Sequence, residues 1–385
     1  MNFKNFFRRN KPIHSYQDFW QWFQKKAKTF HQVVKNKGDF EKVFFDPLSD
    51  KLNELKSGIY YLTGMYDDHT VELIFSADGA LENMIFVDEL VESAPHINGW
   101  LFTALKPATE LEEFSIEMEG YSFDGENIFF YANEHADYPD EIDLTIIHSD
   151  LNDENRGIIV NGTHLFLDNY LGEWYYAAVI DEIKVVAKTE AEQELIPIKK
   201  LKSYLVWRQK EFIEKYEDTW YTHIEDTDRY NLYEVQVKNE TMLLALMNQD
   251  LLDWEGKASH PWLFCIEIKY KGQKSGGMPI GRTRKLINAI EDDLMEQLKP
   301  YEGVLNIGRE TGDNTRTIYL ACKDFRKPSK IVHQLKEGMS KFEMDFDIYK
   351  DKYWKTFNRY MRAGMFNEVC QELKNIDETL VLFPA

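Results

Sequence analysis

The chain has 385 residues, with 46 Lys and Arg against 66 Asp and Glu and a formal net charge of −20. Hydrophobic residues make up 43% of it and aromatic residues 14%, which supplies enough apolar material for folded cores and excludes a disordered chain. No run of about 18 apolar residues occurs, and no apolar segment follows the basic first residues. The sequence therefore predicts neither a membrane span nor a signal peptide.

Cysteine and histidine usage argues against a disulfide framework and a metal centre. Cys265, Cys322 and Cys370 are odd in number and far apart, so we expect a reducing, cytoplasmic location. The ten histidines show no metal-ligand spacing, and no serine-nucleophile elbow is present. The sequence predicts no cofactor, no metal and no catalytic residue.

The N-terminal half is predicted to mix helices and strands in an α+β domain over residues 1–196. Ser15, followed three residues later by Asp18, predicts a capped helix that runs to about Asn36. Periodicity and turn signals predict the following elements in chain order: a helix at 39–55, strands at 59–66 and 70–76, a short helix at 88–94, strands at 100–105, 114–118, 127–131 and 142–148, a helix at 153–170 that Gly157 and Gly162 weaken, and a hairpin of 175–180 with 183–187.

An amphipathic helix within residues 197–217 is predicted to connect this domain to the next. Three strands are expected first, at 219–225, 231–237 and 241–247. A more regular series follows: a strand at 262–270, a helix at 282–298, strands at 304–309 and 315–322, a helix at 329–337 capped by Ser329, and a strand at 342–349. This β-α-β-β-α-β order is ferredoxin-like and defines a domain over 218–360. Helices at 351–361 and 367–375 are expected to close the chain, in a tail over 361–385.

Residues spread through this series resemble a known family. They are Trp220, Pro261-Trp262-Leu263-Phe264, Ile290-Glu291-Asp292-Asp293-Leu294, Asn306-Ile307-Gly308-Arg309-Glu310-Thr311, Arg316 through Tyr319, and Asp351 with Trp354. Over about 218–360 the chain resembles the domain of unknown function family 695. That family is similar in fold to the bacterial regulator of ribonuclease E activity B, a ferredoxin-like inhibitor that acts by binding. The resemblance implies a fold and a bacterial binding protein, and it transfers no catalytic residue.

Negative charge is concentrated in residues 64–196, which hold 30 Asp and Glu against 4 Lys and Arg. Apolar strand patterns run through this block, so it is predicted to be folded with an acidic surface. Such a surface repels phosphate backbones and attracts a basic protein, so we expect a basic protein partner and no direct nucleic-acid binding. The candidate binding residues are Asp67, Asp68, Asp140, Glu141 and Asp143. The alternative, in which the charge only keeps the chain soluble or is neutralised internally, stays open.

Two further candidates lie in the C-terminal domain. The glycine-rich loop of residues 271–281 precedes a helix whose N-terminus, with Arg282, could hold a small anion. The loop lacks the final Gly-Lys-[Ser/Thr] pattern of a P-loop, and a plain strand-to-helix connection is the alternative. Glu291, Arg309 and Arg316 are the residues to test in an enzyme with a site between the domains, or they form a structural ion pair.

Together these patterns favour a non-enzymatic regulatory or interaction module that uses an acidic surface. An enzyme of unknown reaction and a small-anion-binding protein are the alternatives. The sequence makes no prediction about the oligomeric state.

Overall fold

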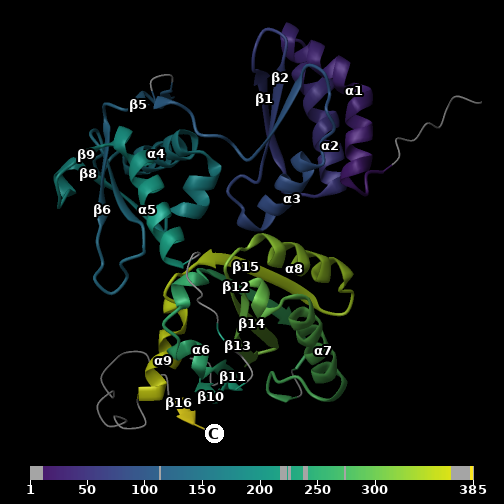
Figure 1. Cartoon of the computed structure of the whole chain (residues 1–385), viewed down its shortest axis with the longest axis vertical. Helices are drawn as coiled ribbons and strands as arrows, with labels where there is room; N and C mark the ends of the chain where they lie inside the picture. The colour runs from purple at the N-terminus through teal and green to yellow at the C-terminus, as the bar shows by residue number, and fades with distance from the viewer. Residues whose placement is uncertain are drawn as a thin grey trace, which may run out of the picture. The chain divides into compact units, whose positions relative to one another are not determined.

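Helices and strands are mixed through the described part of the chain, which confirms the predicted α+β class (Figure 1). The computed structural model describes residues 12–111, 114–216, 223, 227–236, 242–272, 275–365 and 382–384. The chain divides into two units. Unit 1 comprises Met1–Phe130, Ile146–Val179 and Val185–Lys199, and unit 2 comprises Tyr131–Thr145, Ile180–Lys184 and Lys200–Ala385. The units are interleaved along the sequence, and the predicted division into domains stays a prediction.

Unit 1 begins with the predicted capped helix, α1 (Tyr16–Asn36). The Ser15 hydroxyl accepts the backbone N–H of Asp18 at 3.1 Å and donates to the Asp18 carboxylate at 2.8 Å. The second predicted helix opens as a π-helical turn, η1 (Glu41–Phe45), and continues as α2 (Asp46–Leu55). The cap satisfies a free helix-end N–H group, so this boundary can be predicted from the local sequence.

A three-stranded sheet follows, with strand order β1-β2-β3. β1 (Tyr60–Met65) is antiparallel to β2 (Val71–Ser76), and β3 (Trp100–Ala104) is parallel to β2. Aromatic side chains of α1 cover one face of this sheet. Their ring centroids lie 4.5 Å apart for Trp20 and Phe102 and 4.9 Å apart for Phe23 and Trp100. Edge-to-face packing of this kind makes the aromatic layer the core of this part of unit 1.

The helix that joins β2 to β3 is longer than predicted. α3 spans Leu81–Glu92, whereas the sequence predicts a short helix at 88–94. The helix opens directly after a turn in which Asp78 and Gly79 have positive φ, and its N-cap residue, Ala80, offers no capping side chain. The start was therefore missed because no capping signal marks it.

The rest of unit 1 contains the hairpin of β4 (Ile116–Met118) and β5 (Tyr121–Phe123) and the helix α4 (Arg156–Leu171). Four more strands have the order β8-β7-β6-β9. They are β6 (Ile128–Asn133), β7 (Asp143–His148), β8 (Glu182–Ala187) and β9 (Ile196–Pro197). Residues 131–133, 143–145 and 182–184 of these strands fall within unit 2.

The strand predicted at 175–180 is wrong, because Tyr175–Val179 form a π-helical turn, η3. The preceding Glu173 is buried, and its carboxylate accepts three backbone N–H groups, from Ala77 at 2.9 Å, Gly79 at 3.1 Å and Lys106 at 3.0 Å. These bonds hold the chain just after α4, and the N–H of Tyr176 bonds to the carbonyl of Gly172. An apolar run alone does not distinguish a buried strand from such a turn.

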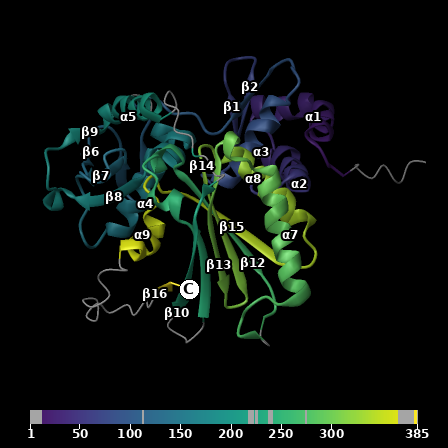
Figure 2. The ribbon, with the colours of Figure 1, turned by 60° about the horizontal axis from the view of Figure 1, so that its bottom comes forward.

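Unit 2 contains the helix α5 (Leu201–Tyr216) and a seven-stranded sheet with the order β15-β12-β14-β13-β11-β10-β16. Its elements are β10 (Tyr230–Gln236), β11 (Met242–Asn248), α6 (Gln249–Asp253), β12 (Trp262–Lys269), α7 (Gly281–Gln297), β13 (Val304–Gly312), β14 (Thr315–Cys322), α8 (Arg326–Gly338), β15 (Glu343–Lys350), α9 (Asn358–Met365) and β16 (Leu382–Pro384). Figure 2 shows α7 and α8 along one side of this sheet. From β12 to β15 the succession of elements is the predicted β-α-β-β-α-β order.

The other face of this sheet carries an apolar core around Trp354, Phe357 and Tyr360, which are almost fully buried with Leu263 and Ile307. Both faces of the central strands are therefore covered, which explains why most residues of β12, β13 and β14 are buried, polar ones included.

Two helix boundaries in unit 2 differ from the prediction. Ser329 lies inside α8, which begins at Arg326, and its hydroxyl donates to the carbonyl of Phe325 at 2.6 Å instead of capping the helix. Residues 351–354 are not helical, because the Asp351 carboxylate accepts the N–H groups of Lys355 and Thr356 at 2.9 Å and so caps the turn η10 (Lys355–Phe357) that precedes α9.

Several predictions fall on residues outside the described part of the chain. They are Trp220, Cys370, the helix at 367–375, and all of the strand at 219–225 except His223.

The glycines of α4 allow a test of the packing in unit 1. A Cβ atom on Gly162 would lie 2.1 Å from the ring of the buried Phe123, whereas one on Gly157 would meet no atom within 4 Å. We expect Gly162→Ala to lower the free energy of unfolding by about 1–3 kcal/mol through overpacking. Gly157→Ala in the same helix should be neutral or stabilising by up to about 1 kcal/mol. Urea denaturation of both variants checks this, and equal stabilities would contradict the packing.

Candidate functional site

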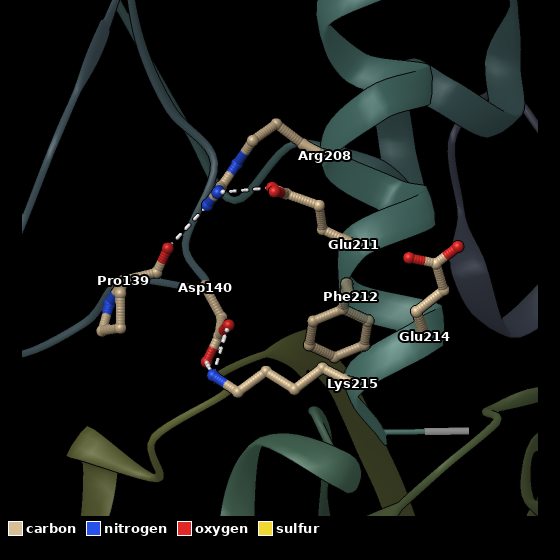
Figure 3. Close-up of a pocket in the computed structure, with 7 residues that line it drawn as sticks. All are labelled: Pro139, Asp140, Arg208, Glu211, Phe212, Glu214 and Lys215. Carbon is tan, nitrogen blue, oxygen red and sulfur yellow. Dashed lines mark hydrogen bonds and ion pairs between the residues drawn. The ribbon is translucent and has the colours of Figure 1, made fainter. Parts of the chain in front are cut away.

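An open pocket of about 490 Å³ lies in unit 2, between α5 and the loop that joins β6 to β7 (Figure 3). Acidic and basic side chains line it together with two apolar residues. The lining residues are Pro139, Asp140, Arg208, Glu211, Phe212, Glu214 and Lys215. Arg208, Glu211 and Lys215 are spaced by three and four residues, so one face of α5 presents them together. The Arg208 guanidinium donates to the carbonyl of Pro139 at 2.6 Å and to the Glu211 carboxylate at 3.3 Å.

Asp140 is the most heavily bonded carboxylate of this pocket. Lys215 donates to it at 2.9 Å, and the hydroxyls of Tyr216 and Tyr353 each donate at 2.6 Å. Burial alone would raise the pKa of Asp140, but the hydrogen bonds from Tyr216, Tyr353 and Lys215 outweigh it and hold the pKa below its usual value. Asp140 is therefore an ionised, saturated acceptor.

A second buried carboxylate, Asp181, lies next to this loop. It accepts the backbone N–H of Ile142 at 2.7 Å and the ammonium of Lys352 at 2.8 Å, and it pairs with Lys350 at 3.2 Å. Lys352 also donates to the backbone carbonyl of Asp140. Burial opposes ionisation of Asp181, but the two lysines lower its pKa below the usual value.

Two lysines thus share one carboxylate. Burial lowers the pKa of Lys350 to about 8, although the charge of Asp181 acts in the opposite direction. The next basic residue along the chain, Lys355, pairs with Glu141 at 2.7 Å. The end of β15 and the segment after it therefore supply the cations that pair with Glu141 and Asp181, while Lys215 of α5 pairs with Asp140.

The five acidic residues predicted to bind a basic partner lie in two places. Asp140 and Glu141 are paired as described, and Asp143 is bonded to His135 at 2.7 Å and Asn133 at 2.9 Å. Asp67 and Asp68 lie in the exposed β1–β2 turn of unit 1. There the Asp67 carboxylate accepts the N–H groups of His69 and Thr70, each at 2.7 Å, and the His69 bond is the main cause of its lowered pKa.

The predicted candidates on α7, β13 and β14 form a buried network. Glu291 accepts Arg309 at 2.6 Å and Arg316 at 3.1 Å, and Arg316 also donates to Thr311 at 3.1 Å and Asn288 at 2.7 Å. Burial lowers the pKa of Arg316, and the charge of Glu291 opposes this. This geometry is the structural ion pair that the sequence analysis left as an alternative. Arg282 is exposed near the start of α7.

The glycine-rich loop is tied to the turn between β13 and β14. The carbonyl of Gly277 accepts the Tyr270 hydroxyl and the N–H of Asn314, both at 2.9 Å, and the N–H of Gly272 donates to the Asn314 side chain at 2.9 Å. Gly277 has φ of +83°, and a Cβ there would lie 2.8 Å from the N atom of Asp313, so glycine is required at this position. Gln273 and Lys274 lie outside the described residues.

Sequence reasoning missed Lys350, Lys352, Tyr353 and Asp181. Asp140 and Tyr353 are 213 positions apart, and Asp181 and Lys352 are 171 apart, so no local spacing connects them. The three closely spaced lysines at the end of β15 and after it, Lys350, Lys352 and Lys355, are a visible signal in the sequence. Their spacing does not indicate which carboxylates they pair with. A similar long-range cluster was missed at buried Glu310, which accepts the hydroxyls of Tyr319 and Tyr360 and the guanidinium of Arg359.

Comparison with known proteins identifies one family. Residues 228–361 match the model of a family of unknown function (DUF695), which confirms the resemblance predicted from the C-terminal residues. No curated protein and no solved structure matches the chain. The likeness to the regulator of ribonuclease E activity B stays a prediction.

Two features are absent from the residues that the structure describes. Within them, no helix combines the length and hydropathy needed to cross a bilayer. The same residues contain no group of three or more His, Cys, Asp or Glu side chains that could hold a metal ion. The arrangement around Asp140 and Asp181 keeps charges in fixed pairs, which is suited to holding surfaces in place.

The pairing of Asp181 can be tested by neutralising it. Asp181→Asn leaves Lys350 and Lys352 buried without a counter-charge, so we expect it to lower the free energy of unfolding by about 3–5 kcal/mol. The matched control is Asp137→Asn in the neighbouring β6–β7 loop, where the side chain is exposed and the expected change is within about 0.5 kcal/mol. Equal denaturation midpoints for the two variants would refute the buried pair.

The shared carboxylate also predicts a pH dependence. The folded protein releases the Lys350 proton near pH 8, whereas the unfolded chain keeps it to a pKa near 10.5, so unfolding takes up a proton between these values. The contribution of Lys350 to the free energy of unfolding should therefore rise with pH across this window and stay flat below it. Denaturation of the wild type and of Lys350→Met at a series of pH values checks this. A stability difference that is constant from pH 8 to 10.5 would count against it.

Proposed function

We propose that this chain is a non-catalytic binding protein that captures a basic protein through exposed carboxylates of unit 1. The observation that carries the proposal is the difference between two groups of acidic residues. Near the pocket of unit 2, Asp140, Glu141, Asp143 and Asp181 each have a donor partner. By contrast, several exposed carboxylates of unit 1 have no cationic partner among the described residues. Those carboxylates are Glu117, Glu119, Glu126, Asp150 and Glu154.

The Lys and Arg residues within 64–196 are too few to neutralise this surface. Residues 64–196 contain four of them for 30 acids, and two are already used: Lys106 pairs with Asp168, and Arg156 pairs with Asp153 and Glu190. A folded surface with such an excess of one sign steers a partner of the opposite sign and rejects one of the same sign. These features support a basic protein as the partner and oppose nucleic acid.

The alternative functions receive less support from the geometry. The Glu291 carboxylate is occupied by two arginines, so it is not available as a general base in this arrangement. In the glycine-rich loop, the N–H of Gly272 is used in a bond to Asn314. Asp140, Glu141 and Asp143 are internally paired, so the expected binding surface is the exposed carboxylates of unit 1 instead.

The test is affinity capture from the source cells at low and high salt. Screening weakens interactions between exposed charges, so a basic protein should be retained at low salt and released at high salt. Joint reversal of Glu117, Glu119, Glu126 and Asp150 to Lys should weaken the affinity for that protein, measured with both components purified, by at least about tenfold.

The control changes the charge of unit 2 by the same amount. Reversal of Asp292, Asp293, Glu296 and Glu337 to Lys alters exposed positions of α7 and α8 and should leave the affinity close to that of the wild type. Retention of the same protein by the unit 1 variant, or equal losses in both variants, would overturn the proposed surface.

A further inference from the structure

β1 is an unguarded edge strand. It pairs with β2, and no other strand in the described part of the chain adds to its free edge. Its sequence, Tyr-Tyr-Leu-Thr-Gly-Met, contains neither a charged residue nor a proline. Edge strands usually carry such residues because free backbone N–H and C=O groups otherwise recruit another strand. β1 thus has the properties of a strand that pairs with a second chain.

The side chains of β1 support this reading. Tyr61 points toward η1 and α2, where its hydroxyl bonds to the Ser49 hydroxyl of α2 at 2.7 Å and to the carbonyl of Phe45, the last residue of η1, at 2.9 Å. Because side chains alternate along a strand, Tyr60 and Leu62 point to the opposite face, and they are 55% and 48% exposed. Leu62 lies beside Ile74 of β2 in the sheet register. The edge therefore continues into an exposed apolar strip.

We propose that β1 pairs in antiparallel fashion with β1 of a second copy of this chain, which joins two three-stranded sheets into one of six strands. An antiparallel strand pair is self-complementary about a two-fold axis, as closed dimers require. In a register centred on Leu62, the two Leu62 side chains are opposed and each Tyr60 lies opposite the partner's Gly64. An aromatic ring across from a glycine is a favourable cross-strand pair.

The charges at the two ends of β1 favour a second copy of this chain as the partner that pairs with it. Lys56 lies just before the strand, and Asp67 and Asp68 lie just after it. Antiparallel pairing brings the basic end of each strand to the acidic end of the other, whereas parallel pairing would place like charges together. Two chains with a net charge of −20 repel each other over most acidic surfaces, and an uncharged strand with complementary ends is a place where they can meet.

The first measurement is the mass of the full chain in solution by sedimentation equilibrium. We expect a dimer for the wild type. Tyr60→Lys with Leu62→Lys introduces like charges at the pairing centre and should weaken dimerisation by at least about tenfold. The control, Ile280→Lys with Tyr301→Lys, changes two exposed apolar residues elsewhere and should remain dimeric. A monomeric wild type, or a folded Tyr60/Leu62 variant that dimerises as the wild type does, would overturn the proposal.

A second measurement does not depend on the stability of the lysine variant. Opposed residues of an antiparallel pair have Cα atoms about 4.5–5.5 Å apart, which is compatible with a disulfide. Leu62→Cys should therefore form a disulfide-linked dimer on a non-reducing gel after mild oxidation, above the background of the wild type. Tyr301→Cys, which is more exposed, should not do so. Equal cross-linking of the two variants would show random collision and would count against pairing through β1.

Discussion

The pocket region of unit 2 depends on one buried carboxylate, Asp181, that two lysines share. Burying three charges costs several kcal/mol per ion, and only close pairing with additional hydrogen bonds offsets that cost. Asp181 meets the requirement because Lys350, Lys352 and the backbone N–H of Ile142 all converge on it. The loop before β7 and the segment after β15 are thus held to each other by charge, and Lys352 extends the connection to the Asp140 carbonyl.

This constraint explains why the acidic residues of the chain do not all have the same role. Where a carboxylate faces the segment after β15, a lysine neutralises it, and its charge contributes to holding the loop in place. In unit 1 the block of residues 64–196 has too few bases for such pairing, and exposed carboxylates remain. The sequence shows the total charge of the block, while the structure separates the part used internally from the part that faces solvent.

The two proposed interfaces rest on different physics. The carboxylates of unit 1 act through electrostatic attraction, which salt screens and which sets the rate of encounter more than the final affinity. The β1 edge acts through backbone hydrogen bonds and a short apolar strip, which salt affects little. A chain with both can form a dimer that persists at ionic strengths where a charged partner is released, so the two interfaces can be measured independently.

The sequence by itself determined those features that neighbouring residues encode. Ser15 and Asp18 mark the start of α1, and period-two alternation with turn residues marks β1 and β2 and the β-α-β-β-α-β series from β12 to β15. The start of α3 and the helical turn η3 could not be read in this way, because α3 has no capping side chain and the apolar run of η3 matches a strand equally well. Only the tertiary structure decided which charges are paired. Asp140, Asp181, Glu291 and Glu310 find partners on other elements, and the free energy of a buried ion pair depends on distances and burial that folding creates.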